Sequence, residues 1–342
     1  MKKFLFMVVA VLCFAGTFTI SDAKTLKLSK NYTRNYKYEY LTMYDMPEQP
    51  YDNKIKIKEP GMYDITIEYL DIKPGEKVEK KNTCLKYSVH DKTDTKYFKV
   101  PIYTKRKSTV GLEKGTAIIS VYPQISENDY TIKYKIKICK SDKQNLSFSK
   151  AVRFAKKKVK SSMKYTKKGN TASITGAKIQ LKSDPKVEKN NQTAIATPVI
   201  QIKKTGKRSY ANLLFKGRFD LYSQGGGRGI TVVSLYNARE FDEKIHMDFC
   251  KFDETKGTCK YDEETGLYKE KVSYHCPVFK SYKNTVKKVD KMISVLKSKK
   301  AYFKLRNSGG EEIYGELDKK TKKKWLDIVK LYRELLEEYN EA

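Results

Sequence analysis

The strongest constraint on the fold of this chain is a strict two-residue alternation of apolar and polar side chains. It is clearest in the segment YTIKYKIKI, where every second residue from Tyr130 to Ile138 is apolar or aromatic. Successive side chains of a β-strand point to opposite faces of a sheet, so this pattern is typical of a strand with one buried face. The same period recurs in Ile55–Ile57, Tyr63–Tyr69, Leu85–Val89 and Ile118–Tyr122.

Turn-forming residues separate these segments. Pro60-Gly61, Pro74-Gly75, Gly111 and Gly115 all fall between alternating stretches. Short strands at this spacing, without a convincing helix, are typical of an antiparallel sandwich. Residues 24–139 are therefore predicted to form an N-terminal antiparallel β-sandwich domain.

The same region carries a family resemblance. The order KLSKNYT (Lys27–Thr33), IKIKEPGMYDITIEY (Ile55–Tyr69), GLEKGTAIISVYP (Gly111–Pro123) and DYTIKYKIKI (Asp129–Ile138) resembles the bacterial pre-peptidase C-terminal domain. The resemblance covers roughly residues 26–139, about a third of the chain. It implies a small exported β-sandwich of the kind found beside secreted enzymes or as a surface-binding module. It supplies no site residues.

The first 23 residues have the composition of a signal peptide. Lys2 and Lys3 precede an apolar run from Phe4 to Gly16, and Ser21-Asp22-Ala23 places small residues before a cleavage point. The run is too short to span a bilayer. We expect cleavage near Ala23 and a secreted or cell-surface location, and the lysine-rich composition favours a bacterial source.

Residues 140–193 form the most basic segment, with 15 basic and 3 acidic residues. Two interpretations remain open. Phe148, Val152, Ala155, Val159 and Met163 follow a helical period, whereas the same stretch also divides into short strands. The segment is thus predicted to be a basic connector or a set of additional strands, with Ser183–Thr193 as a linker.

The last segment, residues 194–342, is predicted to be an α+β domain. Strands are expected at Val199–Ile202, Ala211–Phe215 and Gly229–Tyr236, and a hairpin within Lys300–Leu317. Helical periods run from Val286 to Leu296 and from Trp325 to Tyr339, the second with Asp318 or Thr321 as its cap. The predicted fold is mainly β: a sandwich followed by an antiparallel sheet with two helices, ending in an amphipathic helix.

Signals for catalysis are weak. The histidines are His90, His246 and His275, and no Gly-x-Ser-x-Gly motif is present. A Cys–His enzyme would need Cys276 or Cys250 beside His246 or His275, but adjacent His275 and Cys276 would point to opposite faces of a strand. Gly225–Gly229 is read as a flexible turn. We therefore predict no cofactor and no catalytic residues, and keep a secreted hydrolase with a site in residues 194–342 as the alternative.

The cysteines suggest disulfides more than metal. His246, Cys250, Cys259, His275 and Cys276 gather zinc-type ligands, but without Cys-x-x-Cys spacing. Cys250 with Cys259, and Cys84 with Cys139, are possible disulfides whose connectivity the sequence does not fix. The acidic residues Asp253, Glu254, Asp262, Glu263 and Glu264 lack a calcium-loop spacing and are interpreted as a solvated turn. No metal site is predicted.

Charge is the clearest functional signal. The chain has 71 basic and 40 acidic residues, a net charge of +31, and 62 of the cations are lysine. Arginine suits the bidentate reading of bases, so sequence-specific nucleic-acid binding is not expected. We predict a non-enzymatic exported protein that binds anionic cell-wall polymers or acidic extracellular glycans. The predicted electrostatic contact consists of Lys156, Lys157, Lys158, Lys160, Lys164, Lys167 and Lys168; membrane contact is expected only through residues 147–165.

Overall fold

The computed structural model describes residues 24–38, 51–73, 84–92, 94–101, 103–124, 130–144, 146–182, 193–223, 230–237, 246–248, 254–283, 285–307 and 312–342. The chain divides into two compact units, residues 1–141 (unit 1) and residues 142–342 (unit 2). The predicted signal peptide lies outside the described residues, as do residues 183–192 of the predicted linker.

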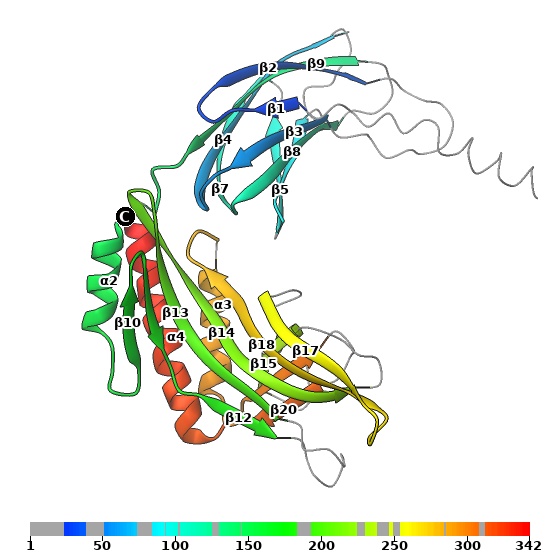
Figure 1. Cartoon of the computed structure of the whole chain (residues 1–342). Coiled ribbons are helices and arrows are strands. Elements are labelled where there is room, and N and C mark those ends of the chain that lie inside the picture. Colours follow the sequence, from blue (N-terminus) through cyan, green and yellow to red (C-terminus); the bar gives the residue numbers. More distant parts are fainter. Residues whose placement is uncertain are drawn as a thin grey trace, which may run out of the picture. The chain divides into compact units, whose positions relative to one another are not determined.

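Unit 1 is built from strands that form two sheets (Figure 1). One sheet has the order β1-β3-β8-β5-β6 and the other β2-β9-β4-β7. Strand β1 pairs with β3 in parallel, whereas the other pairs are antiparallel. The strands are β1 (Lys24–Leu26), β2 (Asn31–Tyr38), β3 (Tyr51–Ile57), β4 (Gly61–Lys73), β5 (Cys84–His90), β6 (Thr95–Pro101), β7 (Lys105–Leu112), β8 (Gly115–Gln124) and β9 (Tyr130–Lys140).

The alternation of apolar and polar residues explains why the two sheets of unit 1 pack against each other. Ile65 and Ile67 on β4 and Ile132 and Ile136 on β9 are fully buried, while the residues between them face outward. They join Ile55, Leu85 and Val121 of the other sheet in one hydrophobic core. The predicted β-sandwich is confirmed.

Unit 2 combines a long curved sheet with helices on one side (Figure 1). Its main sheet has the order β10-β11-β13-β14-β18-β17, with β12 also paired to β13, and a second sheet has the order β16-β15-β19-β20. The elements are α2 (Phe148–Lys157), β10 (Lys164–Lys168), β11 (Thr171–Thr175), β12 (Ile179–Lys182), β13 (Thr193–Thr205), β14 (Arg208–Ser223), β15 (Ile230–Tyr236), β16 (His246–Asp248), β17 (Glu254–Asp262), β18 (Leu267–Lys280), α3 (Val286–Lys297), β19 (Tyr302–Asn307), β20 (Glu312–Glu316) and α4 (Lys319–Glu341).

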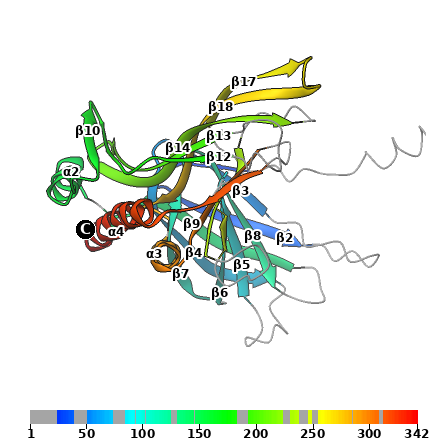
Figure 2. The same ribbon diagram turned by 90° about the horizontal axis from the view of Figure 1, so that it is seen from below.

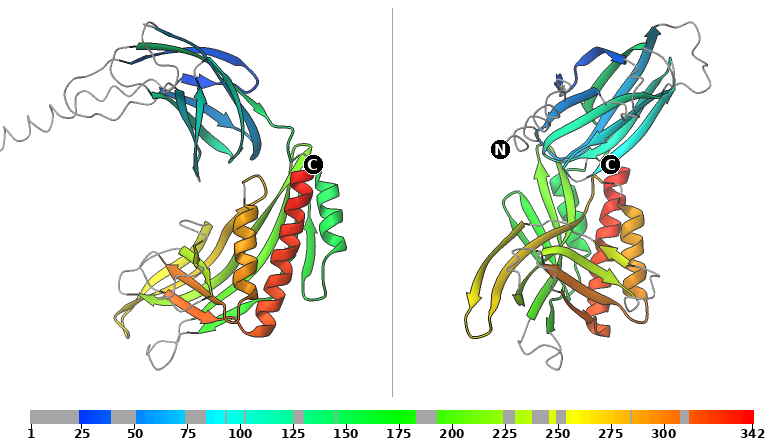
Figure 3. Two further views of the ribbon diagram at one scale, coloured as in Figure 1. Left: turned by 180° about the vertical axis from the view of Figure 1, so that it is seen from behind. Right: turned by 90° about the vertical axis from the view of Figure 1, so that its right-hand side faces the viewer.

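Helices α3 and α4 lie side by side against one face of the main sheet (Figure 3). The apolar stripe of α4 is buried on this face, where the Trp325 ring packs 5.1 Å from Phe215 and 5.2 Å from Phe303. Asp318 caps α4, its carboxylate accepting the backbone N–H of Thr321 at 2.9 Å. The α+β fold class predicted for this region is therefore confirmed.

The basic segment 140–193 contains both kinds of structure that its sequence allowed. Residues 148–157 form helix α2, and β10, β11 and β12 follow as strands of the main sheet. The helix ends at Lys157, so Val159 and Met163 of the predicted helical stripe lie beyond it. Ala151 and Ala155 are the buried residues of α2, which contacts α4, β13 and β14.

Candidate anion-binding surface

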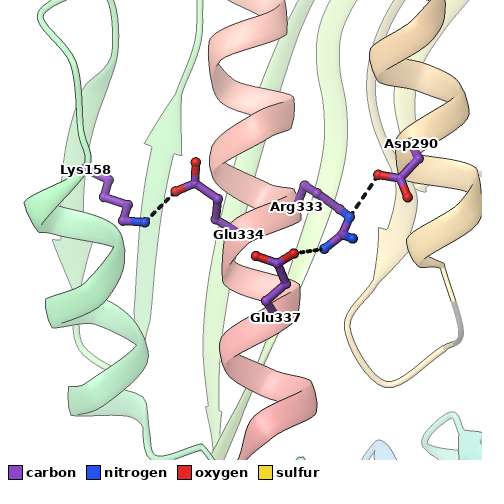
Figure 4. A network of polar contacts seen from close by, with 5 residues as sticks. All are labelled: Lys158, Asp290, Arg333, Glu334 and Glu337. Carbon is purple, nitrogen blue, oxygen red and sulfur yellow. Dashed lines mark hydrogen bonds and ion pairs between the residues drawn. The ribbon is translucent and has the colours of Figure 1, made fainter.

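The seven lysines predicted as a contact surface are not equivalent in the structure. Lys158 bonds to Glu334 of α4 at 2.6 Å (Figure 4), and Lys160 bonds to Asp327 of the same helix at 2.6 Å. These two ammonium groups are neutralised inside unit 2. They help to hold α2 and the turn after it against α4.

The other five lysines are spread over two sides of the sheet. The Lys156 ammonium lies 5.8 Å from the Tyr165 ring and that of Lys167 lies 5.7 Å from the Phe148 ring, so both are on the α2 side. Lys164 and Lys168 differ from Lys167 by an odd number of positions along β10 and point to the opposite face. Lys157 is exposed at the end of α2. The structure does not gather the predicted set into one surface.

Residues 147–165 were predicted as the segment that contacts a membrane, but the apolar side of α2 is not free to do so. The apolar side of α2 is packed against unit 2, with Phe148, Val152 and Phe154 partly buried beside the two buried alanines. None of the helices in the described part of the chain has the length and hydrophobicity that a bilayer crossing requires.

A different basic surface forms around the β17–β18 hairpin, which extends beyond the neighbouring strands (Figure 2). Its turn contains Gly266 at a φ of +68°, a conformation that favours glycine. A Cβ at Gly257 would lie 2.5 Å from the Lys271 carbonyl oxygen, so glycine lets β17 approach β18 closely. These two positions fix the hairpin and the register of its side chains.

Alternation along β14, β18 and β17 sorts the side chains into two faces. Phe215, Phe219 and Leu221 of β14 and Val272 of β18 belong to the core, so the residues between them point away from α3 and α4. The outward residues include five cations. We call this set the hairpin lysine face: Lys216, Arg218, Lys260, Lys269 and Lys271.

Register places like charges together on this face. Lys260 and Lys269 are directly opposite each other on β17 and β18, and Lys271 is two residues further along β18. Directly opposed side chains in an antiparallel pair have Cβ atoms about 5 Å apart, and opposed like charges are destabilising. A bound anion would relieve this repulsion.

One lysine of the face is held by an aromatic ring. The Lys269 ammonium lies 5.3 Å from the centre of the Tyr222 ring. A hydrogen bond with the Tyr222 hydroxyl is the main cause that raises the pKa of Lys269 above its usual value, and Asp262 and Asp220 act in the same direction. The Lys269 head group is therefore positioned beside Tyr222.

Carboxylates on this face are few. Asp220 is engaged by Arg218 at 3.2 Å, and Asp262 accepts the backbone N–H of Glu264 at 3.2 Å in the hairpin turn. None of the four lysines of the face forms an ion pair with a carboxylate of the described residues. The face therefore carries more cations than carboxylates, although Asp220 lies in register opposite Lys271.

This surface is not evident from the sequence alone. Its five cations come from three strands, and only the pairing of those strands brings them together. The alternation in LYKEKVSYH shows that Lys269 and Lys271 lie on the same face of a strand. It does not show which cations of β14 and β17 lie beside them.

Unit 1 offers a more balanced lysine row for comparison. Lys133, Lys135 and Lys137 line the outward side of β9, but Glu68 of β4 is paired in register with Lys135 and Asp71 with Lys133. On the adjoining strand, Lys107 bonds to Asp64 at 2.7 Å. Acidic residues thus lie among this lysine row, as Asp220 lies opposite Lys271 on the hairpin lysine face, and Lys86 and Lys99 of β5 and β6 form another opposed lysine pair. The hairpin lysine face is the better candidate for anions because Lys271 and Arg218 add further cations beside its opposed pair.

The residues considered for catalysis do not form a catalytic group. His90 is exposed at the end of β5, with Nδ1 2.7 Å from the Thr95 hydroxyl. His246 belongs to β16 of the second sheet and His275 to β18 of the main sheet. Cys276 is buried and disulfide-bonded, so it has no thiolate for nucleophilic attack.

The two possible disulfides are not formed. Cys84, Cys139 and Cys259 are thiols, and Cys250 lies outside the described residues. Cys84 lies near Tyr69, whereas Cys139 pairs with Asp64, five residues away along β4. That separation is about 16 Å along a strand, well beyond disulfide reach.

Cys259 lies on β17, which begins at Glu254 and pairs with β18, so Cys259 is opposite Glu270. Within the described ranges, no group of three or more histidine, cysteine or acidic side chains is arranged to hold a metal ion.

The structure defines a two-unit, mainly β protein whose second unit presents a basic strand face. A search of solved structures finds the pre-peptidase C-terminal domain of a collagenase from Bacillus anthracis, with 13% identity and a TM-score of 0.25, over 36% of this chain and 99% of that chain. This is the domain family that residues 26–139 resemble. Tripeptidyl peptidase 2 also matches, with 10% identity and a TM-score of 0.25.

These comparisons describe likeness only. The match to tripeptidyl peptidase 2 covers 86% of this chain and 24% of that protein. No family model matches the chain, and no curated protein matches it.

Proposed function

We propose that this protein is an exported, non-enzymatic binding protein that attaches to anionic polymers of the cell surface or extracellular matrix through the hairpin lysine face. The observation that carries the proposal is the opposed pair Lys260 and Lys269, with Lys271 beside it. Asp220 lies opposite Lys271 in register, but none of the three lysines forms an ion pair with a described carboxylate. A polyanion gains affinity by neutralising such charges and releasing its counterions.

Protection of a sheet edge does not account for this face. Lysines on edge strands often prevent strand-to-strand aggregation, and among the described strands β17 is the outermost of its sheet. However, Lys269 and Lys271 are on β18, and Lys216 and Arg218 are on β14, which are interior strands. Their clustering is better explained by a ligand.

Export is part of the proposal and rests on the sequence. Lys2, Lys3 and the apolar run from Phe4 to Gly16 have the order of a signal peptide. Outside the cell, teichoic acids and acidic glycans are abundant anionic polymers. The test is detection of a chain that begins at Lys24 in the culture medium or on the surface of the producing cell; a chain that stays inside with residues 1–23 attached contradicts export.

The binding experiment uses beads coated with polyphosphate, hyaluronan or neutral dextran. We expect the protein to bind the two anionic polymers at low salt and not the dextran. The variant K260Q/K269Q/K271Q should lose most of this retention, because it removes the three clustered charges of the face.

A matched control removes the same amount of charge elsewhere in unit 2. The variant K157Q/K164Q/K168Q changes three exposed lysines from the set predicted by sequence. It should bind almost as well as the unmodified protein. Equal loss in both variants would mean that net charge alone determines retention, and unchanged binding of the hairpin variant would overturn the proposed surface.

A further inference from the structure

The tip of the β17–β18 hairpin carries a pair of exposed tyrosines. Tyr261 and Tyr268 are paired in register, their ring centres are 5.3 Å apart, and the rings meet edge to face. Tyr261 is 58% exposed and Tyr268 is 37% exposed. Neither belongs to the hydrophobic core of unit 2.

These rings differ from the buried tyrosines of unit 2, although Tyr314 on β20 is also exposed. Tyr274, Tyr332 and Tyr339 are buried, and their rings fill the interior. A cross-strand aromatic pair stabilises a hairpin modestly, and that role needs contact between the rings but no exposed area. Rigid, exposed tyrosines with an apolar face and a polar hydroxyl are suited to stacking on a ligand ring.

The position of the tyrosines relates them to the hairpin lysine face. Along β17, Lys260 points to the outward side and Tyr261 to the other, because adjacent residues of a strand alternate. In the described part of the chain, β17 is the outermost strand of the sheet. A polymer that wraps over this edge strand can touch Lys260 on one side and Tyr261 on the other, and their register partners Lys269 and Tyr268 lie on the adjoining strand β18.

We infer that the ligand of the hairpin is an acidic polysaccharide, whose sugar rings stack on Tyr261 and Tyr268 while its carboxylate or sulfate groups contact Lys260, Lys269 and Lys271. The inference rests on the proposed function and narrows it. A polymer made only of phosphate has the charge but no ring, so the tyrosines contribute nothing to its binding.

The test compares hyaluronan with inorganic polyphosphate as ligands. The tyrosine variant is Y261T/Y268T, since threonine also favours a strand and preserves the hairpin. It should weaken hyaluronan binding about tenfold, in keeping with the modest energy of two aromatic contacts, and leave polyphosphate binding within about twofold. The conservative variant Y261F/Y268F should retain most hyaluronan binding, because the rings remain.

The lysine variant K260Q/K269Q/K271Q serves as the reference and should weaken both ligands. If the tyrosine variant leaves hyaluronan binding unchanged, or weakens both polymers equally, the inference is overturned while the proposed polyanion binding stands. If neither polymer binds the unmodified protein, the proposed function itself fails. Circular dichroism of each variant verifies that the hairpin change has not unfolded unit 2.

Discussion

The salt dependence of binding gives a quantitative test of the hairpin lysine face. Each ammonium group that neutralises a polymer charge displaces a counterion, so the logarithm of the affinity falls with the logarithm of the salt concentration. For a flexible strand the slope is about 0.7 per contact. Lys260, Lys269 and Lys271 form no ion pairs with described residues, so all three charges are available for such contacts.

Replacing these three lysines by glutamine should therefore reduce the slope by about 2. Between about 50 and 200 mM salt, the unmodified protein should lose roughly 20-fold more polyphosphate affinity than the variant does. Fluorescence titrations with labelled polyphosphate at several salt concentrations measure both slopes. Parallel slopes would refute the reasoning, and so would an equal reduction in the K157Q/K164Q/K168Q control.

Three further predictions concern the scaffold. Trp325→Ala should destabilise unit 2 by about 3–5 kcal/mol, because the ring is fully buried and its Nε1 donates to the Ala177 carbonyl at 2.8 Å. Calorimetry should show a lower melting temperature for unit 2, and an unchanged temperature would contradict this role of Trp325. Arg333 bonds to Asp290 at 2.8 Å and to Glu337 at 2.7 Å (Figure 4). Because both carboxylates are exposed, Arg333→Met should lower the free energy of unfolding in urea by less than about 1 kcal/mol. A loss of several kcal/mol would contradict this prediction. Burial raises the pKa of Tyr339 above the unfolded value of about 10, so the contribution of Tyr339 to stability is present below that pH and is lost as the pH rises above it. Tyr339→Phe should make the fall in the free energy of unfolding between about pH 10 and 12 less steep. An unchanged pH profile would contradict a raised pKa of Tyr339.

Local patterns in the sequence were sufficient for the fold class. In the stretches around Ile65 and Ile136 every second residue is apolar. These residues point to one face of their strands, and that face is buried in the core. The helical period from Trp325 to Tyr339 became α4 for the same reason. Asp318 was recognisable as a cap because its carboxylate needs only a backbone donor three residues away.

Long-range pairing explains what the sequence did not show. Lys158 and Glu334 are 176 residues apart, so nothing local to Lys158 reveals that its charge is compensated. The surface around Lys269 depends likewise on the register of three strands. The disulfides proposed for Cys84 and Cys259 failed because cysteine spacing does not fix which strands become neighbours.

In the basic segment 140–193, hydrophobic spacing does not predict where helix α2 ends. The apolar stripe that starts at Phe148 continues to Met163 in sequence, but the helix ends at Lys157. Lys158 adopts a non-helical conformation with its N–H donating to the Ala155 carbonyl at 3.1 Å, and its ammonium group bonds to Glu334. The end of α2 thus coincides with a contact to α4 that hydrophobic spacing does not encode.

The central claim is that binding is localised on the β17–β18 hairpin and is not a general effect of a net charge of +31. The most direct test is lysine footprinting: acetylation rates of individual lysines are measured by mass spectrometry with and without bound hyaluronan, at about 0.15 M salt, where scattered surface charges are largely screened. We predict strong protection of Lys260, Lys269 and Lys271 and little change at Lys157 and Lys164. Uniform protection of all exposed lysines, or protection confined to α2 and β10, would contradict the account.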